Sequence, residues 1–244
     1  MRASSTTQPL ELIHSDTSGK LLKTIGGNQY YILFIDDFTH WAHVYFLADK
    51  TTKTILYTVM HYKHEVEAYW HNKYQIQHFQ IQHFHSDNGN EYDGQLFQNY
   101  LMDNNIKYEP SPPYKQSMNG VAEWKMRTTN CMACSILAEI NVSSKQHLWA
   151  EAVATSVYLR NRLPTRLAKK RQIPYQLWHG KLPSIENLHP FGYLAYANKT
   201  KEQIALERKM KLEQNIHHKP SFASWLDIPA APKYGSYTAW NAIT

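Results

Sequence analysis

The sequence of 244 residues contains only two cysteines and no long uninterrupted hydrophobic segment. Two cysteines cannot build a disulfide framework, so we expect an intracellular protein. The longest apolar run covers residues 30–35, far short of the roughly 20 residues that a membrane helix needs. The N-terminal segment MRASSTTQPLE has no apolar stretch typical of a signal peptide. The sequence therefore predicts neither a membrane protein nor a secreted one.

The positive charge is concentrated in the second half of the chain. Residues 1–120 hold nine Lys or Arg and twelve Asp or Glu, whereas residues 121–244 hold seventeen and eight. Such a distribution fits a polyanionic partner such as nucleic acid, and it equally fits a soluble basic protein with an uneven surface. Hydrophobic residues make up 43% of the chain, which is enough for a sizeable core.

Hydrophobic periodicity predicts an α/β fold. Alternating apolar runs predict strands near residues 10–16, 30–35, 41–47, 79–86 and 106–108, and the second and third are expected to form an antiparallel pair. Steps of three and four residues predict helices over about 55–69, 96–101 and 146–162, and a long helix from Val121. The buried stripe of this long helix is expected to consist of Val121, Trp124, Thr128, Cys131, Met132 and Ile136. Three prolines and an Asn-Gly pair predict a loop over 109–120. This order of elements indicates a mixed sheet flanked by helices.

Three carboxylates occupy positions that suggest metal-dependent chemistry. Asp16 closes the first strand, Asp87 follows the strand after the long helix, and Glu123 lies in the first turn of a later helix, with 35 residues between the last two. Clustered carboxylates repel one another unless a cation neutralises them, and oxygen ligands favour Mg²⁺ or Mn²⁺. Two such ions can promote attack on a phosphodiester. On spacing alone, surface groups or helix caps remain the alternative.

The surrounding motifs resemble the integrase catalytic core of copia-type LTR retrotransposons. The resemblance covers about residues 9–197 and rests on ELIHSDTSG, GGNQYYILFIDDFTHWAHVYFL, HSDNGNEY, SPPYKQSMNGVAEWKMRT, LWAEAVATSVYLRNRLPT and PYQLWHGKLPSIENLHPFGYLAY. It implies a ribonuclease-H-like fold with a mixed five-stranded sheet and a D,D-35-E site that binds two Mg²⁺ or Mn²⁺ ions. The implied catalytic and metal-binding triad is Asp16, Asp87 and Glu123.

The resemblance also implies a reaction and partners. Water or a 3′ hydroxyl of element DNA would attack phosphorus in 3′-end processing and strand transfer. The partners would be DNA and further copies of the chain, and the site of action would be the nucleus. We expect a catalytic core over residues 1–180 and a C-terminal extension over 181–244, in which 198–219 has a charged helical pattern.

The chain differs from the family pattern in several places. Only 15 residues precede Asp16, too few for the His-His-Cys-Cys zinc module, so we expect a fragment of a Pol polyprotein or a relic. Trp124 stands where a basic residue is usual, and Lys20 where proline is usual. Two alternatives therefore stay open: a catalytically silent nucleic-acid-binding relic, and a ribonuclease H-type nuclease.

Five residues near the triad are candidate DNA contacts. Arg127 and Asn130 share a helix face with Glu123, so Arg127 is expected either to hold a DNA phosphate or to form an ion pair with Glu123. Lys125 lies on the same helix. Asn88 and Gly89 follow the second aspartate and would let the backbone approach the site. The loop 109–120 is a candidate flap.

Other conspicuous residues are interpreted as structural. Asp36 and Asp37 are expected to stabilise a turn. The cysteines Cys131 and Cys134 are expected to be buried or half-buried rather than to bind zinc. His83 and His85 are expected to face the active-site end of the sheet without binding metal. The basic run within 166–171 is expected to be a solvated loop, with nucleic-acid contact or nuclear localisation as the alternatives.

Overall fold

The computed structural model describes residues 6–193 except 75–78, 88, 90, 112–119, 144, 168, 169 and 187. The described residues up to Phe191 fall in one compact unit. The expected helical segment 198–219 and most of the expected extension lie outside the described residues. Within the described part, no helix has both the length and the apolar character needed to cross a membrane.

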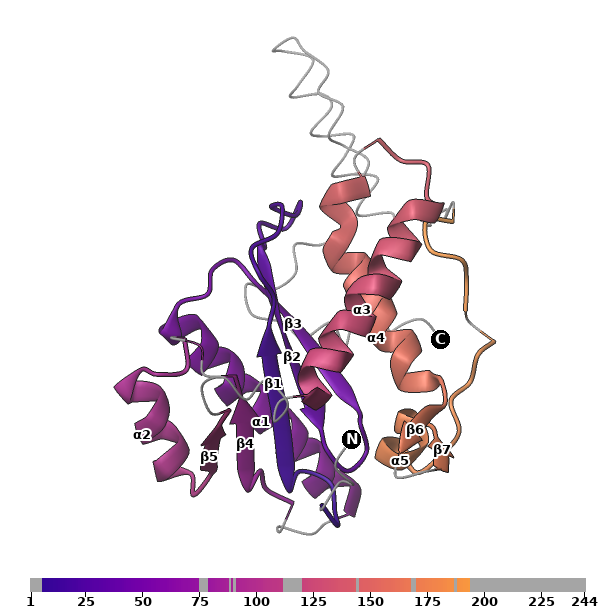
Figure 1. The fold of residues 1–244 in the computed structure, drawn as a ribbon. Coiled ribbons are helices and arrows are strands. Elements are labelled where there is room, and N and C mark those ends of the chain that lie inside the picture. The colour runs from indigo at the N-terminus through magenta and orange to yellow at the C-terminus, as the bar shows by residue number, and fades with distance from the viewer. Residues whose placement is uncertain are drawn as a thin grey trace, which may run out of the picture. The chain divides into compact units, whose positions relative to one another are not determined.

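A five-stranded mixed sheet forms the centre of this unit (Figure 1). The strand order is β3-β2-β1-β4-β5, with β2 antiparallel to β1 and β3, and with β4 parallel to both β1 and β5. The predicted mixed sheet and the predicted antiparallel pair are thus confirmed. The strands are β1 (Leu12–Thr17), β2 (Tyr30–Asp36), β3 (Ala42–Leu47), β4 (His83–Ser86) and β5 (Lys107–Pro110).

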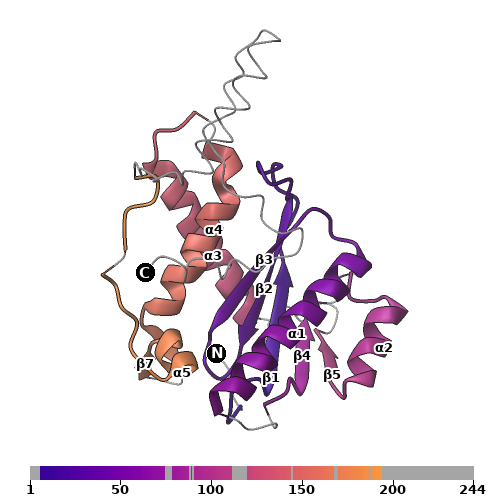
Figure 2. The ribbon, with the colours of Figure 1, turned by 180° about the vertical axis from the view of Figure 1, so that it is seen from behind.

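Helices α1 (Thr52–Tyr74) and α2 (Gln95–Asp103) cover one face of the sheet, as Figure 2 shows. Phe34 of β2 and Phe84 of β4 point into this layer and belong to one buried cluster with Tyr62 of α1. The rings of Phe34 and Tyr62 stack with their centroids 4.3 Å apart. Aromatic side chains therefore form part of the packing between the sheet and α1, together with aliphatic residues such as Ile55 and Val59.

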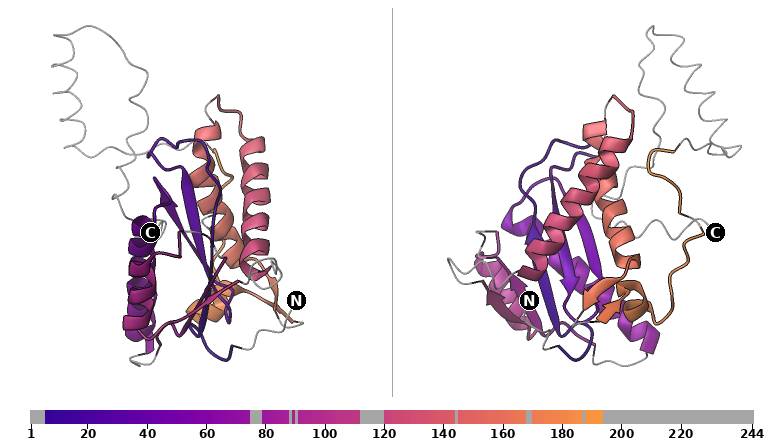
Figure 3. Two further views of the ribbon diagram at one scale, coloured as in Figure 1. Left: turned by 60° about the vertical axis from the view of Figure 1, so that its left-hand side comes forward. Right: turned by 45° about the vertical axis from the view of Figure 1, so that its right-hand side comes forward.

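Helices α3 (Gly120–Glu139) and α4 (Trp149–Arg162) cover the opposite face, and a short 3₁₀ turn (Lys145–Leu148) precedes α4. Figure 3 shows the sheet between the two helical layers. Tyr31, Leu33 and Ile35 of β2 point to this side because side chains alternate along a strand. Since both faces of β2 are covered, its sequence is an almost continuous apolar run.

The buried stripe of α3 differs from the predicted one. The prediction was a stripe of Val121, Trp124, Thr128, Cys131, Met132 and Ile136. The residues actually buried are Ala122, Lys125, Met126, Thr129 and Ala133. Small side chains on this stripe belong to the same buried cluster as Ala150 and Val153 of α4. Helix α3 can therefore approach both α4 and the sheet closely. As a consequence Cys131 and Cys134 are exposed, and the prediction that they are buried is wrong.

The last described elements also differ from expectation. The basic run predicted as a loop contains two strands of an antiparallel hairpin, β6 (Thr165–Leu167) and β7 (Lys170–Gln172). Helix α5 (Pro174–His179) follows, and its Trp178 is buried in the cluster beneath α1. Aromatic stacking of Trp178 on Trp41 and Tyr69 attaches α5 to the sheet and to α1.

Candidate active site

Two members of the candidate triad lie at the ends of neighbouring parallel strands. β1 and β4 pair with Ser15 opposite Ser86. Asp16 follows Ser15 within β1, and Asp87 directly follows the last residue of β4. Because paired strands lie about 4.8 Å apart, this register brings the two aspartates to adjacent positions on the sheet.

Asp16 is partly buried, and its surroundings disfavour a negative charge. Burial, followed by the repulsion from Asp87, raises its pKa to about 7, and Glu123 contributes in the same direction. The backbone N–H of Thr17 and the ammonium of Lys50 act in the opposite direction. Asp16 is therefore protonated far more readily than an ordinary aspartate unless a cation compensates the charge.

The carboxylate of Asp87 is only partly satisfied by protein groups. Burial and the nearby Glu91 raise its pKa, whereas Lys50 and the N–H of Gly89 lower it. Its Oδ1 atom is buried and has no hydrogen-bond partner among the described residues. A buried oxygen of this kind is costly unless a donor or a cation meets it, so the Asp16–Asp87 pair fits a divalent cation by its chemistry.

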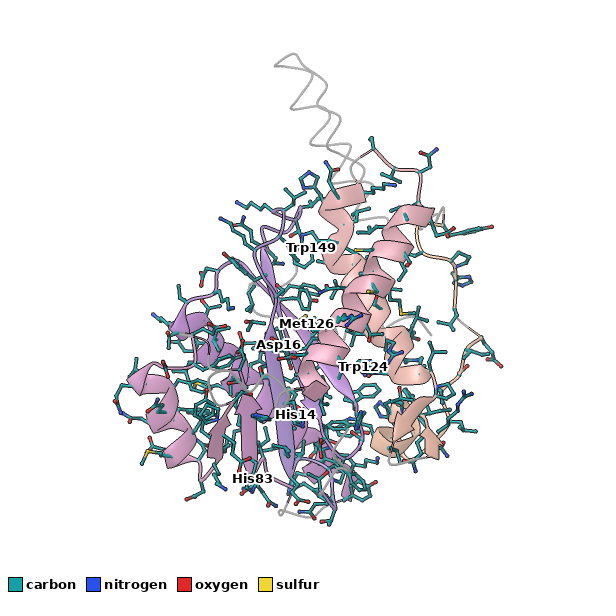
Figure 4. The ribbon with its side chains drawn as sticks, in the orientation of Figure 1. His14, Asp16, His83, Trp124, Met126 and Trp149 are labelled. Atoms are coloured by element: carbon teal, nitrogen blue, oxygen red, sulfur yellow. The ribbon has the colours of Figure 1, made fainter. Side chains whose placement is uncertain are left out.

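Glu123 lies in the first turn of α3, and its side chain is exposed. Helix α3 contacts β1, and Figure 4 shows Asp16 beside the first turns of α3. Glu123 is near enough to contribute to the raised pKa of Asp16. Nevertheless, within the described part of the chain no three His, Cys, Asp or Glu side chains are grouped closely enough to hold a metal ion. The structure therefore brings the two aspartates together and places Glu123 beside them without completing a cluster.

The candidate DNA contacts on α3 differ in their accessibility. Arg127 is exposed, and no ion pair joins it to Glu123 among the described side chains. Asn130 is exposed and its Oδ1 accepts a hydrogen bond of 2.6 Å from the Tyr31 hydroxyl. Lys125 is only 2% exposed and its ammonium donates to the carbonyl oxygen of His40. The prediction that Lys125 contacts DNA is thus wrong for this structure, because the helix turns that side chain into the core.

Of the two candidate contacts after Asp87, Asn88 lies outside the described residues. Gly89 is described, and a Cβ atom there would lie 2.5 Å from Glu91 Oε2. Glycine at this position therefore permits the Glu91 carboxylate to pack directly against the turn that carries Asp87.

Two residues near the aspartates were not predicted as site residues. The Nζ of Lys50 lies 2.6 Å from Oε1 of Glu91, and the same oxygen accepts a hydrogen bond of 2.8 Å from Thr17 Oγ1. Glu91 lies within the motif HSDNGNEY, so the sequence alone could have indicated it as a site residue. Lys50, in the connection between β3 and α1, has no recognisable motif around it, and only the fold places it here.

Hydrogen bonds engage His14 and His85, each two residues before a candidate aspartate, as well as Asp36 and Asp37 near the opposite end of β1. His85 contacts His14 through Nδ1 at 3.3 Å and Ser111 Oγ through Nε2 at 3.1 Å, and His14 Nε2 lies 3.0 Å from Asp37 Oδ1. Asp36 accepts hydrogen bonds from the Leu10 N–H and from the N–H and hydroxyl of Thr39. The turn-stabilising role predicted for Asp36 is confirmed, whereas the Asp37 carboxylate pairs with His14 of β1.

The strand order, the pairing and the two helical layers define a ribonuclease-H-like fold. The structure of a simian T-cell lymphotropic virus intasome in complex with PP2A regulatory subunit B56 gamma aligns with a TM-score of 0.55 and 16% identity. The alignment covers 80% of this chain and 63% of that one. At this identity the likeness concerns the fold alone, and it agrees with the predicted fold class.

Sequence comparisons identify the domain. Residues 6–116 match the family described as "Integrase core domain". The retrovirus-related Pol polyprotein from transposon TNT 1-94 of Nicotiana tabacum is 33% identical over 195 residues, or 80% of this chain, and that from transposon RE2 of Arabidopsis thaliana is 33% identical over 194 residues, or 79%. The chain thus contains an integrase core domain homologous to copia-type retrotransposon Pol polyproteins, as its motifs predicted. It spans 14% and 12% of the length of these two relatives.

Proposed function

We propose that this chain is the catalytic core of a retrotransposon integrase, which processes the 3′ ends of element DNA and joins them to a target duplex. The observation that carries the proposal is the pair of partly buried aspartates, Asp16 and Asp87, at adjacent strand ends of an integrase core domain. Their mutual repulsion and the unpartnered Oδ1 of Asp87 favour binding of a cation.

Asp16, Asp87 and Glu123 would together hold two Mg²⁺ or Mn²⁺ ions. When bound, these ions would supply activation of the attacking hydroxyl and stabilisation of the leaving oxygen of a phosphodiester. The two strands fix the aspartates, so their oxygens are positioned before substrate arrives. Glu123 would approach from the first turn of α3, where its side chain is free to turn toward Asp16.

The DNA would lie along the exposed face of α3. Arg127 is one helical turn beyond Glu123, and with no carboxylate partner among the described residues its guanidinium is available for a phosphate. Asn130 is one further turn along this face, and Asn88 and Gly89 would contact DNA beside Asp87. Further copies of the chain would take part in the reaction, which would occur in the nucleus. Residues 1–180 would form the catalytic core, and residues 181–244 would form a C-terminal extension.

Strand transfer of a short duplex DNA in Mn²⁺ tests the proposal. Asp87→Asn and Glu123→Gln are expected to lower product formation roughly a hundredfold or more, because each removes a charged ligand that is needed in the transition state. Asp103→Asn, at an exposed carboxylate of α2, is the matched control and is expected to retain full activity. Equal activity in all four proteins would contradict the assignment.

Binding of Mn²⁺ is measured in parallel, by calorimetry and by electron paramagnetic resonance. The chain spans only a small part of its polyprotein relatives, and DNA joining requires more than metal binding. The binding measurement therefore tests the metal site separately from DNA joining. DNA binding that is salt-sensitive and independent of metal would favour the catalytically silent relic. Cleavage of an RNA–DNA hybrid without DNA joining would favour the ribonuclease H-type nuclease.

A further inference from the structure

The ion pair of Lys50 and Glu91 stands next to the two aspartates without belonging to the predicted triad. Its atoms are 2.6 Å apart, and the Glu91 side chain is only 9% exposed. The ammonium of Lys50 is close enough to both Asp16 and Asp87 to lower their pKa values. The Lys50 ammonium therefore lies beside the position where a divalent ion would bind.

Glu91 is held rigidly from three sides. Thr17, the residue after Asp16, donates its hydroxyl to Oε1, and Lys50 approaches the same oxygen. Gly89 packs against the other oxygen so tightly that a side chain there would collide with it. Glu91 thus binds Lys50 at a defined position, fixed relative to the end of β1 and to the turn after β4.

We propose that Glu91 holds the ammonium of Lys50 beside the Asp16–Asp87 pair and outside the cation position, so that the ion pair sets the affinity of the site for divalent cations. The inference rests on the proposed function. Without Glu91, the nearest anionic partners of Lys50 would be the two aspartates, and the ammonium would compete with the metal ion for them. Glu91 and Lys50 act as positioning residues and supply no reacting atom.

Removing the charge of Glu91 or of Lys50 distinguishes this role from simple anchoring of the turn after β4. Glu91→Gln leaves a free ammonium at the site, so Mn²⁺ affinity is expected to fall about tenfold. Lys50→Met leaves an additional carboxylate, so affinity is expected to rise about tenfold. The double variant restores the original net charge, and its affinity is expected to lie within about threefold of the wild type. Opposite signs and mutual compensation would not arise if the pair only anchored the loop.

The experiment measures Mn²⁺ dissociation constants at fixed ionic strength by calorimetry and electron paramagnetic resonance. The matched controls are Lys63→Met and Glu67→Gln, which remove the charges of a comparable ion pair of 2.7 Å on α1, where Glu67 binds the Ile81 N–H ahead of β4. Neither control is expected to change the affinity. Circular dichroism melting establishes that every variant is folded.

The outcomes separate this inference from the proposed function. No Mn²⁺ binding by the wild type, or binding unaffected by Asp87→Asn, would overturn both. Wild-type binding that depends on Asp87, together with equal losses in Glu91→Gln, Lys50→Met and the double variant, would overturn the role of the ion pair alone. Opposite shifts that cancel in the double variant would support it.

Discussion

Lys125 is a charged residue in the interior of the domain. Burial and then the nearby Arg160 lower its pKa from 10.5 to about 7, and its ammonium donates to the carbonyl oxygen of His40. The unfolded chain therefore binds this proton more tightly than the folded one. The contribution of Lys125 to stability is unfavourable below pH 7 and improves as the pH rises from about 7 toward 10.5.

Lys125→Met is therefore expected to increase the free energy of unfolding by about 2–4 kcal/mol at pH 6. The difference from the wild type is expected to shrink toward pH 10, where the wild-type side chain is largely neutral in the folded state. Chemical denaturation at both pH values measures the effect. Lys107→Met, at a lysine whose side chain is 69% exposed, is the control and is expected to change little at either pH. A pH-independent effect of Lys125→Met would contradict the prediction.

Asp16 gives a second pH-dependent prediction, with the opposite direction. Its folded-state pKa of about 7 exceeds the ordinary value of 3.8, so the folded chain loses stability as the pH rises from about 4 to 7. In metal-free buffer, Asp16→Asn is expected to raise the melting temperature at pH 8 and to change it little at pH 4. Thermal unfolding followed at both pH values checks this. A gain of equal size at pH 4 would indicate that charge is not the cause.

Single residues were predicted with uneven success, for identifiable physical reasons. Asp16 and Asp87 could be proposed from the sequence because Asp16 lies near the end of a strand and Asp87 directly follows one, each within a distinctive motif. Lys125 was taken for a surface residue because lysine is almost never fully buried. Lys50 could not be found from the sequence, since only the fold brings the connection after β3 beside the turn after β4.

Gly89, in the turn after β4, and Gly120, at the start of α3, differ in how much room they leave for a side chain. Gly89→Ala would press a methyl group against the carboxylate of Glu91, whose position Thr17 and Lys50 fix. We expect a loss of about 1–3 kcal/mol in stability and weaker Mn²⁺ binding. Chemical denaturation and calorimetry provide the two measurements.

Gly120→Ala is the matched control for that substitution. Among the described residues, no atom lies within 4 Å of a Cβ atom at Gly120, the first residue of α3. Alanine favours the helix over glycine, so this variant is expected to be neutral or slightly stabilised. Equal destabilisation of the two variants would mean that the contact with Glu91 is not the cause.

The types and order of the main elements followed from hydrophobic periodicity, whereas the orientation of α3 did not. The predicted buried stripe of α3 consisted mainly of larger side chains. Large hydrophobic residues are the signal that periodicity detects in a single sequence. Helix α3 packs on β1, β2 and α4 at once, and this crowding favours the alanines at 122 and 133 instead. The register of a helix between two layers depends on its neighbours, which local sequence does not reveal.

Across the whole unit, the described core extends to α5. Trp178 is 2% exposed and stacks on Trp41 and Tyr69, although it lies far from both in the sequence. Trp178→Ala is expected to lower stability by about 3–5 kcal/mol, the usual cost of removing a buried aromatic side chain. Urea denaturation measures it. Tyr193→Ala, at a 73% exposed aromatic residue, is the control and is expected to have little effect.

The pairing of β1 has a consequence for the order of events during folding. Ser15 lies opposite Phe34 of β2 in the antiparallel pair and opposite Ser86 of β4 in the parallel pair. One edge of β1 therefore pairs with a strand that is close in the sequence, and the other edge pairs with a strand that is far away in the sequence. Closing the longer loop costs more chain entropy, and parallel pairs of distant strands form slowly. The two aspartates therefore meet only when β4 joins the sheet. Recovery of Mn²⁺ binding during refolding would then report the docking of β4, later than the formation of the β1–β2 hairpin.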